Sequence, residues 1–446
     1  MNYLTQETLL LITTCIAMVS MISTKLLTDR WITPCLFYWG VWIMAIIANL
    51  VTTALDVLPP ITLLGCELIL QAHLGTLIGF AYSGLLLKMI SKGDKQVIRP
   101  AIYESEAYYA VAKWVIISLT LITGGVLLER ISSIGFVADF YQQVRQAYLF
   151  ESKSILTRIS FWALPLYMVF AVTLGARAGA NIRGDNKLLI GIIVALIFAS
   201  ISSGSRIIIF TFAGLYIFGR LILLEDRAQG APISYIFKNF GKQAIIGFAI
   251  LVILFQIMHM WRAADPFDSR PDNHLSYWVP AEFASYMALP AAALGPLVDT
   301  VDQNKRGYGQ VLFPFMGKIL SFGGVAWEPV VELDFVNRQI LQDNDMRIGW
   351  VQGTAIIGMV ADFGRENVWL TSALLMSTTQ YLFLVYVKRG LTGILIASQA
   401  CFATFFSFQD AWFFNSNIIL SLLWAYYLSR KINSVIRKNN NGYVSG

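Results

Sequence analysis

Charged side chains are scarce in this 446-residue chain: only 13% of the residues are Asp, Glu, Lys or Arg, whereas 57% are hydrophobic. A water-soluble domain could not cover so much apolar surface, so the composition excludes an ordinary globular protein and indicates a polytopic membrane protein. The formal net charge of +6 does not by itself point to nucleic acid. In a membrane protein, what matters is where the charges lie along the chain.

Cysteine and histidine are also rare, with 4 and 3 residues respectively. The cysteines, Cys15, Cys35, Cys66 and Cys401, fall within apolar runs and lack metal-ligand spacing, so we expect packing residues and no disulfide. The chain also lacks a Gly-rich nucleotide loop, a His/Glu metal motif, a Ser-His-Asp arrangement and an internal repeat. The sequence therefore gives no reason to expect a cofactor or a metal.

Long apolar runs are abundant, and about 11 of them are each long enough to cross a bilayer. They predict an all-α polytopic membrane protein forming a single integral membrane domain over residues 1–446. The first run follows an acidic residue and has no small-residue cleavage site, so we interpret it as a retained helix and not as a signal peptide. The runs lie at 7–24, 31–54, 61–87, 111–128, 159–176, 188–203, 206–223, 243–261, 367–387, 391–408 and 412–429.

Lys and Arg occupy alternate connections between these runs, and this alternation predicts the orientation of the chain. Basic residues follow every odd-numbered run, from Lys25 and Arg30 to the tail 430–446, whereas the connections near 56–60 and at Gln409 hold none. We therefore expect the N-terminus outside and the C-terminus in the cytoplasm. The end of that tail, after its basic cluster, has a composition typical of disorder.

Two outer segments break the pattern of short connections: 129–158, which we interpret as a first functional loop, and 262–366, a large loop. Apolar stretches of the large loop are interrupted by Pro290, Pro296 and Pro314. Such stretches are too broken to span and suit re-entrant or interfacial helices.

One arginine, Arg206, stands in an otherwise apolar region, directly after the sequence SSGS at 202–205. In the expected topology this sequence forms a tight outer turn, Ser205 caps the next helix, and Arg206 lies in its first turn at the interface. The helix dipole disfavours a cation there unless an anion binds, and phosphate at a helix N-terminus is a common solution. The alternative is an arginine that snorkels to lipid headgroups.

The stretch SSGSRIIIFTFAGLYIFGR, the arginine-bearing outer loop before it, and the large outer loop followed by GTAIIGMVADFG resemble the bacterial oligosaccharide repeat-unit polymerases, or O-antigen polymerases. The likeness covers most of the chain in layout, but its motifs are short. It implies a metal-independent glycosyltransferase of the inner membrane, with a periplasmic N-terminus and a cytoplasmic C-terminus. Within the GTAIIGMVADFG patch, Gly358 and Gly364 suit close helix packing, and Asp362 and Arg365 are candidates to pair with each other.

The resemblance implies that a glycan is released from polyprenyl pyrophosphate and joined to a hydroxyl of a repeat unit on a second lipid carrier. Donor and acceptor are thus both polyprenyl-pyrophosphate-linked oligosaccharides, in contact with membrane lipids. No nucleic acid and no cofactor is implied. Whether a chain-length regulator also binds is left open, as are the sugars, the linkage and the polymer length.

The pyrophosphate leaving group calls for cations, which arginine side chains supply without a metal. Arg206 is carried over as the turn arginine of the family's helical hairpin. The other pyrophosphate-binding candidates follow by position in the two outer loops: Arg145, Arg158, Arg262 and Arg270. For Arg158, directly before a span, an interface anchor is an equal alternative.

A general base would deprotonate the accepting hydroxyl, and the catalytic candidates are His274 and Glu328. His274 is the only histidine in an outer loop, whereas His73 and His259 fall within spans and suit packing. Glu282 is comparable to Glu328. Three aromatic residues are candidates for stacking on sugars, although belt aromatics are common at membrane interfaces: Trp278, Tyr286 and Trp327.

Other classes of membrane protein remain as alternatives. An O-antigen ligase shares the topology, the arginines and the donor, and differs in transferring the glycan to a lipid core. A polysaccharide transporter or flippase would place charged residues or broken helices at the membrane midplane. Only His73 and Lys113 favour this alternative. A metal-using carrier-dependent glycosyltransferase would need paired acidic residues in the first outer loop, which offers only Asp56. A purely structural membrane protein would leave the outer arginines unexplained.

Overall fold

The structure of the protein is a computed structural model. It describes residues 5–28, 30–55, 58–90, 105–135, 140, 143–144, 154–180, 182, 185–204, 207–228, 233–242, 287–301, 307, 311–312, 354–387, 390–408 and 416–442. Every regular element within these ranges is a helix, as the composition predicts.

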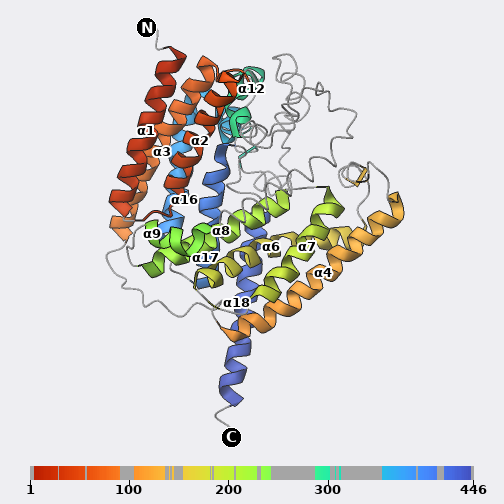
Figure 1. Ribbon diagram of the computed structural model, residues 1–446. Coiled ribbons are helices and arrows are strands. Elements are labelled where there is room, and N and C mark those ends of the chain that lie inside the picture. The colour runs from red at the N-terminus through yellow and green to blue at the C-terminus, as the bar shows by residue number, and fades with distance from the viewer. Residues whose placement is uncertain are drawn as a thin grey trace. The chain divides into compact units, whose positions relative to one another are not determined.

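The chain divides into two compact units (Figure 1). Unit 1 comprises residues 1–95, 269–385 and 400–416, and unit 2 comprises residues 96–268, 386–399 and 417–446. Both units are discontinuous in sequence, and each is described here by itself.

Unit 1 is built on α1, α2 and α3, which lie side by side (Figure 1). Thr33 begins α2 by accepting a hydrogen bond from the Leu36 amide at 3.3 Å, and Pro34 at the first helical position needs no amide donor. The helices of unit 1 are α1 (Gln6–Thr28), α2 (Pro34–Ala54), α3 (Leu63–Ile90), α12 (Leu294–Thr300), α15 (Ala355–Phe363) and α16 (Val368–Tyr386), with short 3₁₀ turns at Arg365–Asn367 and Phe406–Phe408.

Two glycines bring α3 into backbone contact with α16. A Cβ atom on Gly75 would overlap the carbonyl of Trp369, and one on Gly79 would overlap the carbonyl of Ala373. Small residues four positions apart allow such close approach, and the dispersion energy it brings is a main source of helix association in membranes.

The core of unit 1 contains a histidine enclosed by aromatic rings. His73 is fully buried in α3, and its ring centroid lies 5.0 to 6.0 Å from those of Tyr38, Trp39 and Trp42 in α2. The prediction that His73 is a packing residue is confirmed by this position.

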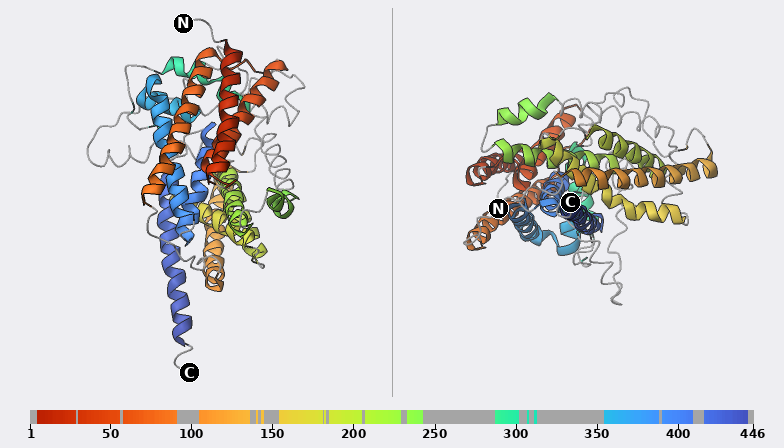
Figure 2. Two further views of the ribbon diagram at one scale, coloured as in Figure 1. Left: turned by 90° about the vertical axis from the view of Figure 1, so that its left-hand side faces the viewer. Right: turned by 90° about the horizontal axis from the view of Figure 1, so that it is seen from below.

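Unit 2 contains four long apolar helices, together with the C-terminal helix α18 and shorter helical segments. The C-terminal part of α18 projects away from the other helices of this unit (Figure 2). The elements are α4 (Glu106–Ile134), α6 (Ile155–Gly179), α7 (Asn186–Ser203), α8 (Ile207–Ala228), α9 (Ile233–Ile236), a π-helical turn (Phe237–Gly241) and α18 (Ser416–Gly442), and the two units share α17 (Gly390–Phe405).

Contacts between α4 and its neighbours fix the helix directions within unit 2. Tyr108 at the start of α4 meets Thr173 near the end of α6, so α4 and α6 are antiparallel. Further along α4, Thr120 donates to the Gly191 carbonyl of α7 at 3.4 Å, and a Cβ on Gly124 would lie 3.4 Å from Phe198. Residue numbers increase in the same direction along both helices at these contacts, so α4 and α7 are parallel.

Helices α6 and α8 pack through glycines. A Cβ on Gly175 would overlap the Tyr216 carbonyl, and one on Gly179 would lie 2.6 Å from the Arg220 carbonyl. Residue numbers increase in the same direction along α6 and α8 at these contacts, so the two helices are parallel. Consequently, the end of α4, the start of α6 and the end of α7 lie at one end of this four-helix group, and α8, which follows α7, begins beside the middle of α6.

Eight of the described helices are long and apolar enough to cross a membrane, and they match eight of the expected spans. The expected span 391–408 is a shorter helix of 16 residues followed by a 3₁₀ turn. The expected span 412–429 is part of α18, which continues through its basic residues to Gly442 and is not among the eight. The span 243–261 lies outside the described residues, so a total of 11 stays a prediction.

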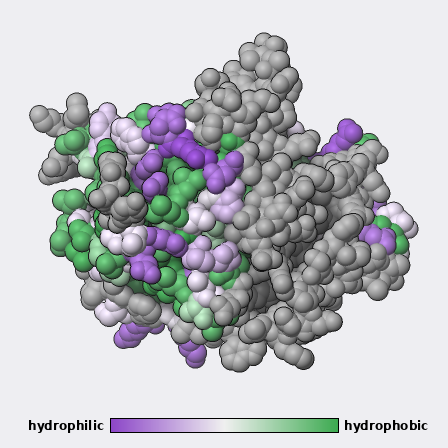
Figure 3. Space-filling view, turned by 90° about the horizontal axis from the view of Figure 1, so that it is seen from above, coloured by the Kyte–Doolittle hydropathy of each residue, from purple (hydrophilic) through white to green (hydrophobic). Residues whose placement is uncertain are grey.

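The hydropathy of the described surface is what we expect of helices that cross a membrane and end in water. Seen from above, hydrophilic residues gather in patches among hydrophobic ones over the described surface (Figure 3). Along the flanks, large apolar side chains such as Leu26, Leu121 and Ile155 are more than 70% exposed. Three of the cysteines are buried and Cys15 is exposed on α1, as expected for packing or lipid-facing positions.

Candidate functional site at one end of unit 2

The candidate site is the end of unit 2 where α7 turns into α8. Helix α7 ends at Ser203, and Gly204 closes it with φ 61°, a left-handed conformation that glycine adopts without strain. Helix α8 begins at Ile207. Ser202 and Ser203 belong to the last turn of α7 and donate to the Ala199 carbonyl, so the connection begins at Gly204.

Arg206 itself lies outside the described residues, as does its expected cap, Ser205. Its position in the chain is nevertheless bracketed, because it directly precedes the first residue of α8 and follows the last residue of α7 by three. Both helices are candidate membrane spans. In sequence, Arg206 therefore falls in a connection between spans and not at the middle of one.

The same end of unit 2 holds the junction between α4 and α6. Ser154 caps α6 by accepting from the Thr157 amide at 3.1 Å, and its hydroxyl donates to the Glu129 carboxylate at 2.9 Å. Because Glu129 belongs to α4, this hydrogen bond ties the two helices together across the intervening chain. The first functional loop was predicted to begin at residue 129, but α4 continues to Ile134 and is closed by Gly135 at φ 80°.

Two arginines are described at this end, and they differ in exposure. Arg158 is exposed in the first turns of α6, next to the Ser154 cap. Arg130 is 7% exposed on α4 and was interpreted from sequence only as a loop residue. Burial of Arg130 is the more unusual arrangement, because a buried guanidinium group requires compensating polar contacts, whereas the exposed Arg158 is solvated. Arg130 lies on the buried face of α4 with Thr123 and Val126, a face that the nearly uniform apolar sequence of this helix does not mark.

The remaining candidate residues cannot be placed against these two. They lie outside the described residues: Arg145, Arg262, Arg270, His274, Glu328, Glu282, Trp278, Tyr286, Trp327 and His259. Of the pyrophosphate-binding candidates, the described residues thus include only Arg158, which lies at the same end of unit 2 as the end of α7 and the additional Arg130. The general base stays a prediction.

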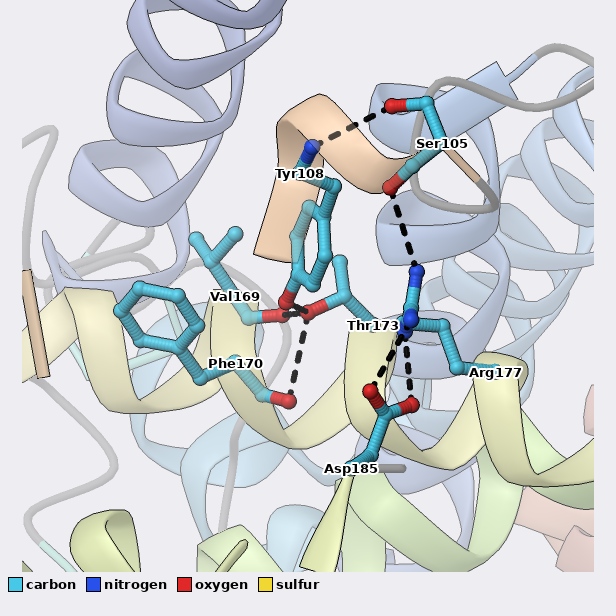
Figure 4. Close-up of polar contacts among 7 residues, drawn as sticks. All are labelled: Ser105, Tyr108, Val169, Phe170, Thr173, Arg177 and Asp185. Carbon is cyan, nitrogen blue, oxygen red and sulfur yellow. Dashed lines mark hydrogen bonds and ion pairs between the residues drawn. The ribbon is translucent and has the colours of Figure 1, made fainter. Parts of the chain in front are cut away.

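The opposite end of unit 2 holds a buried ion pair that the sequence did not reveal (Figure 4). Arg177 on α6 donates to Asp185 through Nε at 2.6 Å and Nη2 at 2.9 Å, a bidentate arrangement. The guanidinium also lies 5.2 Å from the Tyr108 ring, and the Tyr108 hydroxyl meets Thr173. The Arg177 and Asp185 side chains are only 5% and 14% exposed, so this cluster is a structural link between helices and not an open binding site.

The GTAIIGMVADFG patch forms α15 in unit 1, and its charged residues do not pair as expected. Asp362 accepts hydrogen bonds from the Val311 and Leu312 amides, whereas Arg365 pairs with Asp299 at 2.9 Å. The suggested Asp362–Arg365 pair was wrong, because each side chain reaches a different part of the segment 262–366. Gly358 does provide close packing, since a Cβ there would lie 3.1 Å from Leu312.

Within the described ranges, no three His, Cys, Asp or Glu side chains gather in a way that could hold a metal ion. The charged side chains described at this end of unit 2 include the carboxylate of Glu129 and the guanidinium groups of Arg130 and Arg158. Guanidinium groups bind anions, phosphates in particular.

Comparisons with known proteins add no relative. No family model, curated protein or solved structure matches the chain.

Proposed function

We propose that the protein is a polysaccharide polymerase that joins polyprenyl-pyrophosphate-linked oligosaccharide repeat units at the periplasmic face of the bacterial inner membrane. The product is O-antigen or a similar surface polysaccharide. The proposal combines the resemblance of the SSGSRIIIF hairpin to repeat-unit polymerases with an arrangement of helices that suits an interfacial anion site.

The observation that carries the proposal is the location of the hairpin connection. Helices α7 and α8 are apolar enough to span, and α7, which Arg206 follows by three residues in the sequence, ends where unit 2 also carries Arg130 and Arg158. Several arginines at one end of a group of spans favour a ligand with several negative charges. A pyrophosphate at the membrane surface is such a ligand, and its lipid chain would keep it there.

Electrostatic stabilisation is the main chemical demand of the proposed reaction. The acceptor hydroxyl forms a bond to the anomeric carbon of the donor glycan, and the bond from that carbon to the pyrophosphate oxygen breaks. The hydroxyl proton passes to a general base, for which His274 and Glu328 are the candidates. The electron pair of the broken bond stays on the pyrophosphate, and arginine forks around it lower the barrier by stabilising the developing charge.

The polar features at midspan do not favour the transporter alternative. His73 is enclosed by aromatic rings, and Lys113 is exposed within the first turns of α4, 5.9 Å from the Trp114 ring. Neither residue forms part of a described polar pathway. An aromatic cage around a buried histidine is an ordinary packing arrangement, and an exposed lysine near a helix end can snorkel to headgroups.

The central prediction concerns Arg206. We expect Arg206→Ala to reduce glycan transfer by about 100-fold or more, because losing one preorganised donor to a developing anion has costs of this size. Arg206→Lys should keep only part of the activity, since a lysine supplies charge without the bidentate fork. Transfer is measured as the glycan ladder in a strain whose only copy is the variant, with membrane levels quantified in parallel.

The matched control is Lys187→Ala, which removes an exposed cation from the other end of the same helical hairpin. That variant should retain the full ladder. A full ladder from Arg206→Ala at normal protein level would refute the anion site. Equal losses in both variants would show that the hairpin is merely sensitive to charge removal.

The deletion strain distinguishes the polymerase from the ligase. A polymerase deletion leaves single repeat units attached to the lipid acceptor and abolishes the long ladder. A ligase deletion leaves no attached unit and lets polymer accumulate on the polyprenyl carrier. Accumulation of unpolymerised carrier-linked units on the cytoplasmic side would instead indicate a flippase.

A further inference from the structure

Asp362 is a buried carboxylate at the end of α15 whose described partners lie about 50 residues earlier in the chain. Its side chain is fully buried, and Oδ2 accepts from the Leu312 amide at 2.8 Å. Both carboxylate oxygens also lie 3.2 Å from the Val311 amide. Charge-assisted hydrogen bonds of this kind are stronger than those between neutral groups, and they hold residues 311–312 against α15.

Gly307 makes a second contact with the same helix end. Its amide donates to the Ala361 carbonyl at 3.0 Å, and a Cβ atom at this position would overlap Oδ1 of Asp362. The carboxylate therefore approaches the backbone of residue 307 so closely that only glycine fits without a shift. From the middle of α15, Gly358 leaves room for Val311 and Leu312 in the same way.

Arg365, one turn beyond Asp362, reaches a different part of the same segment. Its Nη2 donates to Asp299 at 2.9 Å and to the Val298 carbonyl at 3.3 Å, near the end of α12. The Asp299 side chain is 64% exposed, so this contact is solvated, unlike the buried contacts of Asp362. Exposed ion pairs contribute little, so the buried carboxylate carries most of the restraint.

We propose that Asp362 is a positioning residue that anchors the segment 294–312, which begins with α12, to the end of α15 through the backbone of residues 307, 311 and 312. The consequence for catalysis rests on the proposed function, because this segment belongs to the expected large loop that also contains the candidates Arg262, Arg270, His274 and Glu328. Without the carboxylate, the amides of Val311 and Leu312 lose their acceptor inside the protein. A buried donor without a partner is costly, so the segment would separate from α15 to reach water.

The anchor is tested by the accessibility of Leu312, which is fully buried. Leu312→Cys is introduced into a Cys15→Ser background, which removes the exposed native cysteine. In the purified full-length protein, a water-soluble maleimide should label Cys at position 312 about tenfold faster or more when Asp362→Ala is added. The matched control, Asp299→Ala, removes the exposed ion pair of the same segment and should change the rate by less than about twofold.

Gly307 tests whether the contact is direct. Gly307→Ala alone should accelerate labelling, because the new methyl group would overlap the carboxylate. In the Asp362→Ala background, the same substitution should add little, since the clashing oxygen is gone. Full additivity of the two substitutions, or an Asp362→Ala rate equal to that of Asp299→Ala, would overturn the anchor.

Two further readouts keep the outcome unambiguous. If Asp362→Ala does not accumulate, Asp362→Asn replaces it. The amide oxygen of asparagine still accepts from the Leu312 amide, so we expect a labelling rate between those of the wild type and Asp362→Ala. A rate equal to that of the wild type would count against the anchor. The glycan ladder of the same variants tests the catalytic consequence. Faster labelling with an unchanged ladder would refute the positioning role but keep the contact, whereas a wild-type protein without any polymerase activity would refute only the proposed function.

Discussion

At the scale of single residues, a buried ion pair links helices of unit 2. Arg177 and Asp185 are joined by two hydrogen bonds and are both largely shielded from water. The third guanidinium nitrogen of Arg177, Nη1, also points into the protein and donates to the Ser105 carbonyl at 3.5 Å. The pair therefore links the end of α6 with the starts of α7 and α4. Loss of one partner would leave the other charge buried and uncompensated.

We expect Arg177→Ala to lower the free energy of unfolding by about 3 kcal/mol, because removing one partner of a buried pair leaves the other uncompensated. Asp185→Ala should have a similar effect, and the double substitution should cost less than the sum of the two. A denaturant titration of the purified protein in detergent measures all three.

The exposed pair Arg365–Asp299 provides the comparison. Its side chains are 35% and 64% exposed, so Arg365→Ala should cost no more than about 1 kcal/mol. Comparable losses for Arg177→Ala and Arg365→Ala would contradict the assignment of Arg177 as a buried structural link.

At the scale of helices, glycine pairs with a spacing of four allow close backbone contacts in both units. In unit 1 the pair on α3 meets α16, and in unit 2 the pair on α6 meets α8. The prediction is sharpest for Gly79, where a Cβ atom would overlap the Ala373 carbonyl. We expect Gly79→Ala to destabilise the protein by about 1 to 3 kcal/mol, the usual cost of overpacking, as measured by the same titration.

Gly84 on the same helix is the matched control, since a Cβ atom there meets nothing within 4 Å. Alanine is the better helix former, so Gly84→Ala should be neutral or stabilising by up to about 1 kcal/mol. If both substitutions had the same effect, the close approach of α3 and α16 would not be a determinant of stability.

The elements that sequence analysis identified are those defined by local signals. Eight spans follow from hydropathy, and the α7–α8 connection follows from the serines and glycine before Arg206. The contacts of Asp362 with residues 50 positions away, and the partner helices of the Gly75 and Gly175 pairs, depend on which elements meet. The local pattern of a single sequence contains no signal for such pairings, which is why Asp362 was matched to its neighbour Arg365.

Arg177 illustrates the same limit in a different way. Its place near the end of an apolar run made it one of the basic residues that define the cytoplasmic side. The structure shows it buried against Asp185 and Tyr108, so its charge is shielded from the membrane surface. Orientation must therefore depend more on basic residues that stay exposed, such as Lys187 on α7.

At the scale of the whole molecule, the orientation of the chain can be tested with two conservative substitutions in unit 2. Ser132 near the end of α4 and Ser434 on α18 are both exposed. In a Cys15→Ser background, we expect Ser132→Cys to react with a membrane-impermeant maleimide in intact spheroplasts. Ser434→Cys should react only after permeabilisation, because the tail basic residues favour the cytoplasm.

The two positions also test the span that lies outside the described residues. Between Ser132 and Ser434 the chain passes α6, α7, α8, α16, α17 and α18, which is an even number of helices if all of them cross. Opposite sides for the two cysteines therefore require one more crossing, and the run 243–261 supplies it. If both cysteines react from the same side, either this run or one of α17 and α18 does not span. Only failure of the run 243–261 would move the segment 262–366 off the face that carries the Arg206 connection, because α17 and α18 follow that segment in the chain.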